Sequence, residues 1–122
     1  MPYAKFPPPE WYWRFPVREY VRALDGDTFR VLIDQGDSDY SMVTVRLEGI
    51  DCYELGDPNG KGIEAAAFAD YRMLAARSIT IETTDARERY TFGRYRGLVF
   101  CDGKNLADLL RAAGYEKPGD SA

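Results

Sequence analysis

The 122-residue sequence contains no histidine. This absence excludes catalysis by Ser-His-Asp or Cys-His groups, ribonuclease chemistry with paired imidazoles, and every zinc site with a histidine ligand. Acid–base or metal chemistry in this chain must therefore use Asp, Glu, Lys, Tyr or Cys side chains.

Cysteine is scarce, since the chain has only Cys52 and Cys101. Two thiols are too few to hold a structural zinc ion, although they could form one disulfide. The N-terminal residues show no apolar core of a signal peptide, so we expect a cytoplasmic protein with both thiols reduced. No apolar run approaches the ~20 residues that cross a membrane, and we therefore expect no membrane contact.

An excess of positive charge is also missing, because 16 Lys and Arg stand against 20 Asp and Glu, a net charge of −4. This is not the bulk charge of a protein that coats nucleic acid. A local positive site is still compatible with it, because cations can cluster on one face of a small domain. The length suits one domain with its own core.

The first 16 residues differ from the rest in composition. They hold five of the seven prolines and six aromatic residues. Proline density argues against a helix or a central strand, so we expect an arm at 1–16, a domain at 17–116 and a tail at 117–122. We expect residues 3–16 to pack on the domain, or to contact a second copy or a protein partner. A base-stacking segment is the alternative.

Beyond the arm, the residue pattern predicts five strands and two helices. Alternating and β-branched runs predict the strands, with Phe29, Val31 and Ile33 on one face of the second. The strands are expected at 17–24, 28–33, 42–50, 78–84 and 95–101. The helices are expected at 63–77 and 105–113.

The two expected helices have different signals. The first is rich in alanine, with Phe68, Tyr71 or Arg72, and Ala75 at helical spacing. In the second, Asn105 is the expected N-cap and Gly114 the stop. Three strands, a helix, two strands and a helix is the order of an OB-type barrel. The expected fold class is therefore mainly β with α (α+β), a five-stranded OB-fold barrel with two packed helices.

Acidic residues stand where the expected strands begin and end. Asp27 opens the second strand, Asp51 directly follows the third, and Glu54 comes three residues later. Carboxylates at neighbouring strand ends of a barrel can converge, and hard divalent cations bind such oxygen ligands. Taken alone, however, an Asp beside a glycine is ordinary turn chemistry, as in residues 25–27.

Two arginines accompany these carboxylates. Arg46 lies on the polar face of the third strand, and Arg94 begins the approach to the fifth. Guanidinium groups bind phosphate oxygens bidentately, so arginines with carboxylates and without histidine fit a site for a phosphate and a metal. Lone arginines more often pair with surface acids, here Glu48 or Asp85.

The order and spacing of these residues resemble the staphylococcal nuclease (thermonuclease) family. The family pattern is D-G-D-T, then R-L-x-G-I-D-x-P-E, then a helix with E-A, and then Y-G-R. Tyr53 and Phe92 stand where the family has proline and tyrosine. Over residues 19–116 the matching segments are DGDT at 25–28, RLEGIDCYE at 46–54, EAAAF at 64–68, FGR at 92–94 and DGK at 102–104.

The resemblance implies a calcium-dependent phosphodiesterase, an endonuclease that hydrolyses DNA or RNA and leaves 3′-phosphate ends. It implies that Asp27 and Asp51 bind Ca²⁺ together with the backbone carbonyl of Cys52. It also implies that Glu54 activates or orients the attacking water. Because the Cys52 ligand is main chain, its side chain is free to differ from the family's usual residue.

The resemblance further implies that Arg46 and Arg94 bind the phosphate and stabilise its transition state. Phe92, Arg87 and Arg89 are additional expected substrate-binding residues. The alternative function is a non-catalytic module on the same fold that binds nucleic acid or protein, and such modules lack the metal and catalytic residues. A third alternative is an inhibitory or scaffold protein that acts through the arm.

Overall fold

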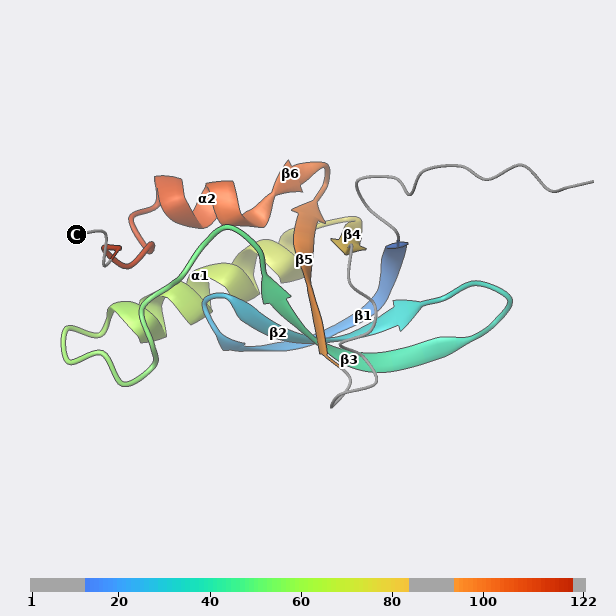
Figure 1. Cartoon of the computed structure of the whole chain (residues 1–122), viewed down its shortest axis with the longest axis horizontal. Coiled ribbons are helices and arrows are strands. Elements are labelled where there is room, and N and C mark those ends of the chain that lie inside the picture. The colour runs from blue at the N-terminus through green and yellow to red at the C-terminus, as the bar shows by residue number, and fades with distance from the viewer. Residues whose placement is uncertain (1–12, 84–93, 120–122) are drawn as a thin grey trace, which may run out of the picture.

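The computed structural model describes residues 13–83 and 94–119. Figure 1 shows a β-barrel with two helices and a C-terminal segment beside it. The elements are β1 Trp13–Asp25, β2 Thr28–Asp34, β3 Tyr40–Leu47, α1 Lys61–Ala75, β4 Ile79–Thr83, β5 Arg94–Cys101, β6 Lys104–Asn105 and α2 Leu106–Ala112.

Five strands close into the barrel. Antiparallel pairs join the strands in the order β3-β2-β1-β4-β5, and a parallel pairing of β3 with β5 completes the ring. The two-residue strand β6 pairs with the end of β5. The protein is therefore mainly β with two helices, and the expected OB-type barrel is confirmed.

The barrel interior is filled by alternate residues of its strands, as the period of a β-strand requires. The expected inward faces of β2 and β3 are confirmed. Each such apolar side chain contributes about 1.5–3 kcal/mol when it is fully buried. The residues of these two faces are Phe29, Val31 and Ile33 in β2, and Val43, Val45 and Leu47 in β3.

Strand β1 begins at Trp13, four residues before the expected start, so residues 13–16 belong to the barrel. Phe15 is buried and packs against Tyr95, with 5.8 Å between the ring centroids. The prediction that proline excludes a central strand is wrong here. Pro16 stands where β1 leaves β4 and joins β2, and its missing N–H is tolerated at that change of partner. Residues 1–12 of the expected arm lie outside the described residues.

Helix α1 buries only part of the expected face, because Phe68 and Arg72 are half-buried and Phe68 packs against the core. Its buried residues are small or flexible, whereas Tyr71 is 67% exposed and Ala75 is exposed too. The small side chains let the helix lie close to β1, where Asp70 accepts hydrogen bonds from the Tyr20 hydroxyl and from the Ala23 N–H. The residues on the buried face are Gly62, Ala65, Ala69 and Met73.

The predicted N-cap and stop of helix α2 are both confirmed. Asn105 is the N-cap, and its side chain accepts a hydrogen bond of 2.9 Å from the Ala107 N–H. Leu106 and Leu110 are fully buried, and Gly114 has a φ of 88° just after the helix. Within residues 13–83 and 94–119, no helix combines the length and the apolarity needed to cross a membrane.

Candidate functional site

The tight turn between β1 and β2 supplies the most buried carboxylate of the candidate site. Asp27 is 5% exposed, its N–H donates to Asp25, and its Oδ1 accepts a 3.1 Å hydrogen bond from the Thr28 hydroxyl. Gly26 allows this burial, because a Cβ there would lie 2.8 Å from the Cβ of Ala65 in α1. Tertiary packing therefore requires the glycine.

The loop after β3 brings the second carboxylate to the same place. The chain turns at Gly49, which has a φ of 82°, and returns beside the β1–β2 turn. The Cys52 N–H donates a 2.8 Å hydrogen bond to Asp27 Oδ2, and the Leu47 N–H donates one of 2.8 Å to the Asp27 carbonyl. As a result, Asp51 and Asp27 lie at one end of the barrel.

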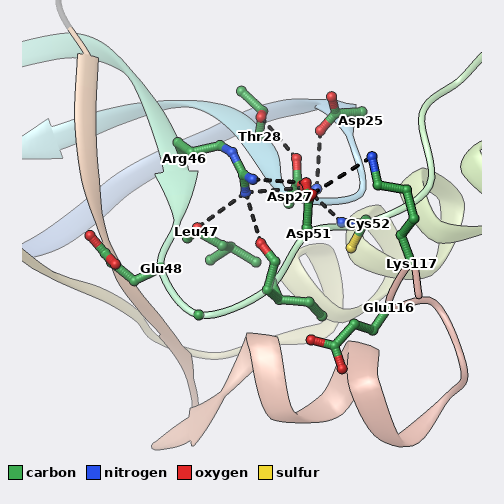
Figure 2. A network of polar contacts seen from close by, with 12 residues as sticks. Asp25, Asp27, Thr28, Arg46, Leu47, Glu48, Asp51, Cys52, Glu116 and Lys117 are labelled. Atoms are coloured by element: carbon green, nitrogen blue, oxygen red, sulfur yellow. Dashed lines mark hydrogen bonds and ion pairs between the residues drawn. The ribbon is translucent and has the colours of Figure 1, made fainter. Parts of the chain in front are cut away.

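Arg46 lies between these two carboxylates. Its Nη1 is 3.1 Å from Asp27 Oδ2, and its Nη2 is 3.1 Å from Asp51 Oδ1. The guanidinium also donates to the carbonyls of Leu47 and Ile50, each at 3.1 Å. Figure 2 shows the side chain reaching from β3 into this cluster. Arg46 is therefore part of the site and does not form the surface pair with Glu48 that a lone arginine would suggest.

The environment of Asp27 raises the pKa of its carboxylate into the mildly acidic range. Burial raises the pKa of Asp27 to about 6, and the neighbouring Asp25 adds to the increase. The Cys52 N–H and the Arg46 guanidinium oppose the shift because they stabilise the ionised form. At pH 7 the carboxylate is therefore mostly ionised, and it becomes protonated within the mildly acidic range.

Glu54 lies farther out in the same loop, with a side chain that is 83% exposed. Its Oε1 is 4.0 Å from the Nζ of Lys117, and the same Nζ is 3.6 Å from Asp51 Oδ2. Sequence reasoning assigned Lys117 to a tail and missed this contact. No local motif marks the residue, because it reaches the site only through the path of the chain after α2.

The expected second arginine, Arg94, begins β5. Its backbone pairs with Thr44, two residues before Arg46 in β3, so it belongs to the strand beside Arg46. Nothing further is described of its side chain, and Arg87, Arg89 and Phe92 lie outside the described residues. The structure thus brings together Asp27, Arg46, Asp51, Cys52 and Glu54.

A further arginine that the sequence analysis missed lies next to Arg46. Arg96 is the direct strand partner of Arg46 and is exposed, with its Nε 3.9 Å from Glu48 Oε1. Both arginines line a surface cleft of about 370 Å³, together with Glu48, Asp51 and Glu116. The two guanidinium groups would favour an anion in this cleft, whereas the carboxylates of Glu48, Asp51 and Glu116 would oppose it.

The ligands expected for calcium are all hard oxygens. Among the described residues, no group of three or more acidic or cysteine side chains gathers closely enough to hold a metal ion. Two carboxylates do converge, because Asp27 and Asp51 bind the same guanidinium, and the main chain of Cys52 lies against Asp27. Carboxylate oxygens are of the type that Ca²⁺ binds, together with carbonyl, water and substrate oxygens. The Cys52 group that contacts Asp27 is its N–H.

Both cysteines are buried and free. Burial raises the pKa of Cys52 to about 12 and that of Cys101 to about 11, so neither thiol ionises near pH 7. The Cys101 thiol lies 3.4 Å from the sulfur of Met73 in the core. A neutral, buried thiol is inert, and Cys52 therefore contributes to the site through its main chain.

The chain was compared with models of known protein families and with curated protein sequences, and it matches none of them.

Proposed function

We propose that this protein is a calcium-dependent phosphodiesterase, an endonuclease of the staphylococcal nuclease type that hydrolyses DNA or RNA to 3′-phosphate ends. The observation that carries the proposal is the position of Arg46 between Asp27 and Asp51, with Glu54 in the same loop. Carboxylates, a guanidinium and a base are groups that can together promote phosphodiester hydrolysis without histidine.

In this proposal each residue has a separate role. Arg46 binds a non-bridging phosphate oxygen and neutralises the charge that develops there, and Arg94 acts from the adjacent strand. Glu54 orients the attacking water and accepts its proton, for which its exposed position gives access to solvent. The nucleic acid would enter along the cleft that Arg46 and Arg96 line.

Asp27, Asp51 and the carbonyl of Cys52 would hold the Ca²⁺ ion. When bound, this ion would neutralise phosphate charge as a Lewis acid. In the structure, Arg46 forms ion pairs with both carboxylates. Binding of an anionic phosphate gives the guanidinium an alternative partner, which would leave the two carboxylates for the metal. The two buried free thiols support a cytoplasmic location.

The decisive experiment measures cleavage of labelled single- and double-stranded DNA and RNA, with added calcium and with a chelator. We expect cleavage with calcium only, and products that carry 3′-phosphates. Full activity after exhaustive chelation would contradict the proposed mechanism.

Two substitutions test the roles assigned to the side chains. Glu54→Gln keeps the size of the side chain and removes its basicity, and it should lower the cleavage rate by about 10²-fold or more. Arg46→Ala should cost a similar factor through lost charge stabilisation. The matched control is Arg30→Ala, because Arg30 is exposed on the neighbouring strand β2 and contacts Thr44 at 3.4 Å.

A non-catalytic module that binds nucleic acid is the second candidate function. It is supported by the backbone register of β3 and β5, which makes Arg46 and Arg96 direct strand partners that line one cleft. Binding of an oligonucleotide without cleavage, weakened equally by Arg46→Ala and Arg96→Ala and unaffected by Glu54→Gln, would favour this function.

A further inference from the structure

The segment that follows α2 crosses the loop that carries Asp51 and Glu54. Glu116 forms an antiparallel bridge with Cys52, and the Lys117 N–H donates a 2.8 Å hydrogen bond to the Asp51 carbonyl. Tyr115 packs on Phe68 of α1, with 5.5 Å between the ring centroids. The main chain of residues 115–117 is therefore fixed against the candidate site.

Arg111 in α2 adds a second attachment. Its Nη2 donates a 2.5 Å hydrogen bond to the carbonyl of Gly49, and its Nε lies 3.0 Å from Glu116 Oε1. One side chain thus connects the start of the site loop to the segment that crosses it. Such charge-assisted hydrogen bonds are stronger than neutral ones, so α2, the loop and the segment form one connected unit.

The main chain of Glu54 is also well defined. Its carbonyl accepts a 3.0 Å hydrogen bond from the Asp57 N–H, and a Cβ at Gly62 of α1 would overlap that carbonyl. Its carboxylate, by contrast, projects into solvent. The ion pair that the structure gives this carboxylate is with Lys117.

We propose that Lys117 is a positioning residue for Asp51 and Glu54. Its ammonium lies 3.6 Å from one carboxylate and 4.0 Å from the other, while its backbone is bound to the same loop. A single cation between two like charges holds them near each other and limits the range of Glu54. The role in hydrolysis rests on the proposed function, and the contact itself does not.

The same cation also competes with a bound metal. Lys117 repels a divalent ion at Asp51, so it lowers calcium affinity while it orders Glu54. Removal of the charge should therefore change the two properties in opposite directions. A substitution that merely loosened the fold would impair both.

The test compares the full-length protein with Lys117→Met, which keeps the aliphatic stem, and with Lys117→Arg, which keeps the charge. Lys104→Met is the matched control, because Lys104 is an exposed lysine in β6. Calcium affinity is measured by titration calorimetry, and kcat and KM are measured on a single-stranded DNA oligonucleotide.

For Lys117→Met we expect calcium to bind about fivefold more tightly. We expect kcat to fall about tenfold while KM stays within about twofold. Lys117→Arg and Lys104→Met should stay within about twofold of the natural protein in all three quantities. An unchanged Lys117→Met variant would overturn the proposal, and so would a loss of both calcium affinity and kcat.

Failure of the proposed function has a different outcome. In that case the natural protein neither binds calcium nor cleaves nucleic acid. NMR of ¹³C-labelled glutamate carboxyl groups then tests the contact between Lys117 and Glu54 directly. The positioning role would be supported if the chemical shift of Glu54 changes in Lys117→Met and stays the same in Lys117→Arg. A Glu54 signal that stays unchanged in Lys117→Met would contradict it.

Discussion

Two acidic turns of the barrel, one at residues 25–28 and one at residues 34–40, have similar sequences and opposite surroundings. Each places a glycine beside an aspartate. Asp27 in the first turn is 5% exposed, whereas residues 36–40 of the second are all exposed. The difference arises from packing, because α1 and the loop after β3 cover the first turn.

The second turn is held by its own hydrogen bonds. The Gly36 N–H donates to Asp34 Oδ1 at 2.8 Å, and the Gln35 N–H donates to the Asp39 carbonyl at 2.8 Å. Its middle residues adopt positive φ, including 55° at Asp37. In Figure 1 this turn lies at the end of the molecule opposite α2. Asp37 and Asp39 are exposed to solvent, and the half-buried Asp34 accepts its hydrogen bond from within the turn.

The first turn depends on residues from other parts of the chain. Its buried carboxylate receives the Cys52 N–H and the Arg46 guanidinium, and Lys117 adds a cation at Asp51. A buried charge is costly unless it is paired and hydrogen-bonded. An acidic turn is thus a candidate site when neighbouring elements bury it and supply compensating groups, and otherwise it is only a turn.

The largest expected difference between the turns is in activity. Asp27→Asn keeps the shape and removes the charge, so it should lower cleavage by about 10²-fold or more, because the proposed metal loses one of its two carboxylates. Asp37→Asn in the exposed turn should leave cleavage unchanged. Both rates are measured on one DNA substrate with saturating calcium. Equal losses would show that long-range charge, and not the site, explains the effect.

Glycine substitutions separate crowding from backbone strain. Gly26→Ala places a Cβ 2.8 Å from Ala65 and 3.0 Å from Cys52, and should lower the free energy of unfolding by about 2–3 kcal/mol. Gly36→Ala meets no atom within 4 Å but has a φ of 88°, so it should cost about 1 kcal/mol.

Urea unfolding measures both glycine variants, and cleavage assays follow. Only Gly26→Ala should also reduce activity, because it displaces the Cys52 main chain from Asp27. If Gly36→Ala proves the more damaging variant, the proposed close packing around the first turn is wrong.

The buried turn should also respond to pH. Because the pKa of Asp27 is raised to about 6, the folded protein binds this proton more readily than the unfolded chain does. The stability that protonated Asp27 contributes is full below about pH 4 and is lost as pH rises through 6. Calcium binding needs the ionised form, so affinity should fall about tenfold per pH unit below 6.

Calorimetric calcium titrations at pH 5, 6 and 7 test this dependence. Asp37→Asn serves as the control, and it should show the same pH dependence as the natural protein. A calcium affinity that stays constant from pH 7 to pH 5 would contradict the assigned role of Asp27.

The smallest effect is expected at the thiol beside the first turn. Cys52→Ala keeps the main-chain N–H and carbonyl, and a thiol with a pKa of about 12 supplies no nucleophile at neutral pH. Cleavage should therefore stay within about threefold of the natural rate. A loss of two orders of magnitude, with unchanged calcium affinity, would assign chemistry to the sulfur.

Local patterns in the sequence were enough to predict the barrel and to name several residues that lie together in the candidate site. The alternation of Phe29, Val31 and Ile33 defines an inward strand face whatever the strand pairs with, and the Asn105 cap is satisfied within its own helix turn. Asp27 and Asp51 were predicted to converge because both were placed at strand ends, which are neighbours in space on one side of a barrel. Asp27 does precede β2, but β3 ends at Leu47, three residues before the expected end, and Asp51 reaches the site through the loop that turns at Gly49.

Contacts between distant segments were not predictable in this way. The start of β1 depends on pairing with β4, which makes Pro16 acceptable where a local rule forbids it. The buried face of α1 consists largely of glycine and alanine, whose weak hydrophobic signal a period search overlooks. Lys117 reaches Asp51 and Glu54 only because α2 packs on the barrel and directs the chain across the loop. The charge balance of the site was therefore set by packing between elements, since no residue near Glu54 in sequence encodes its partner.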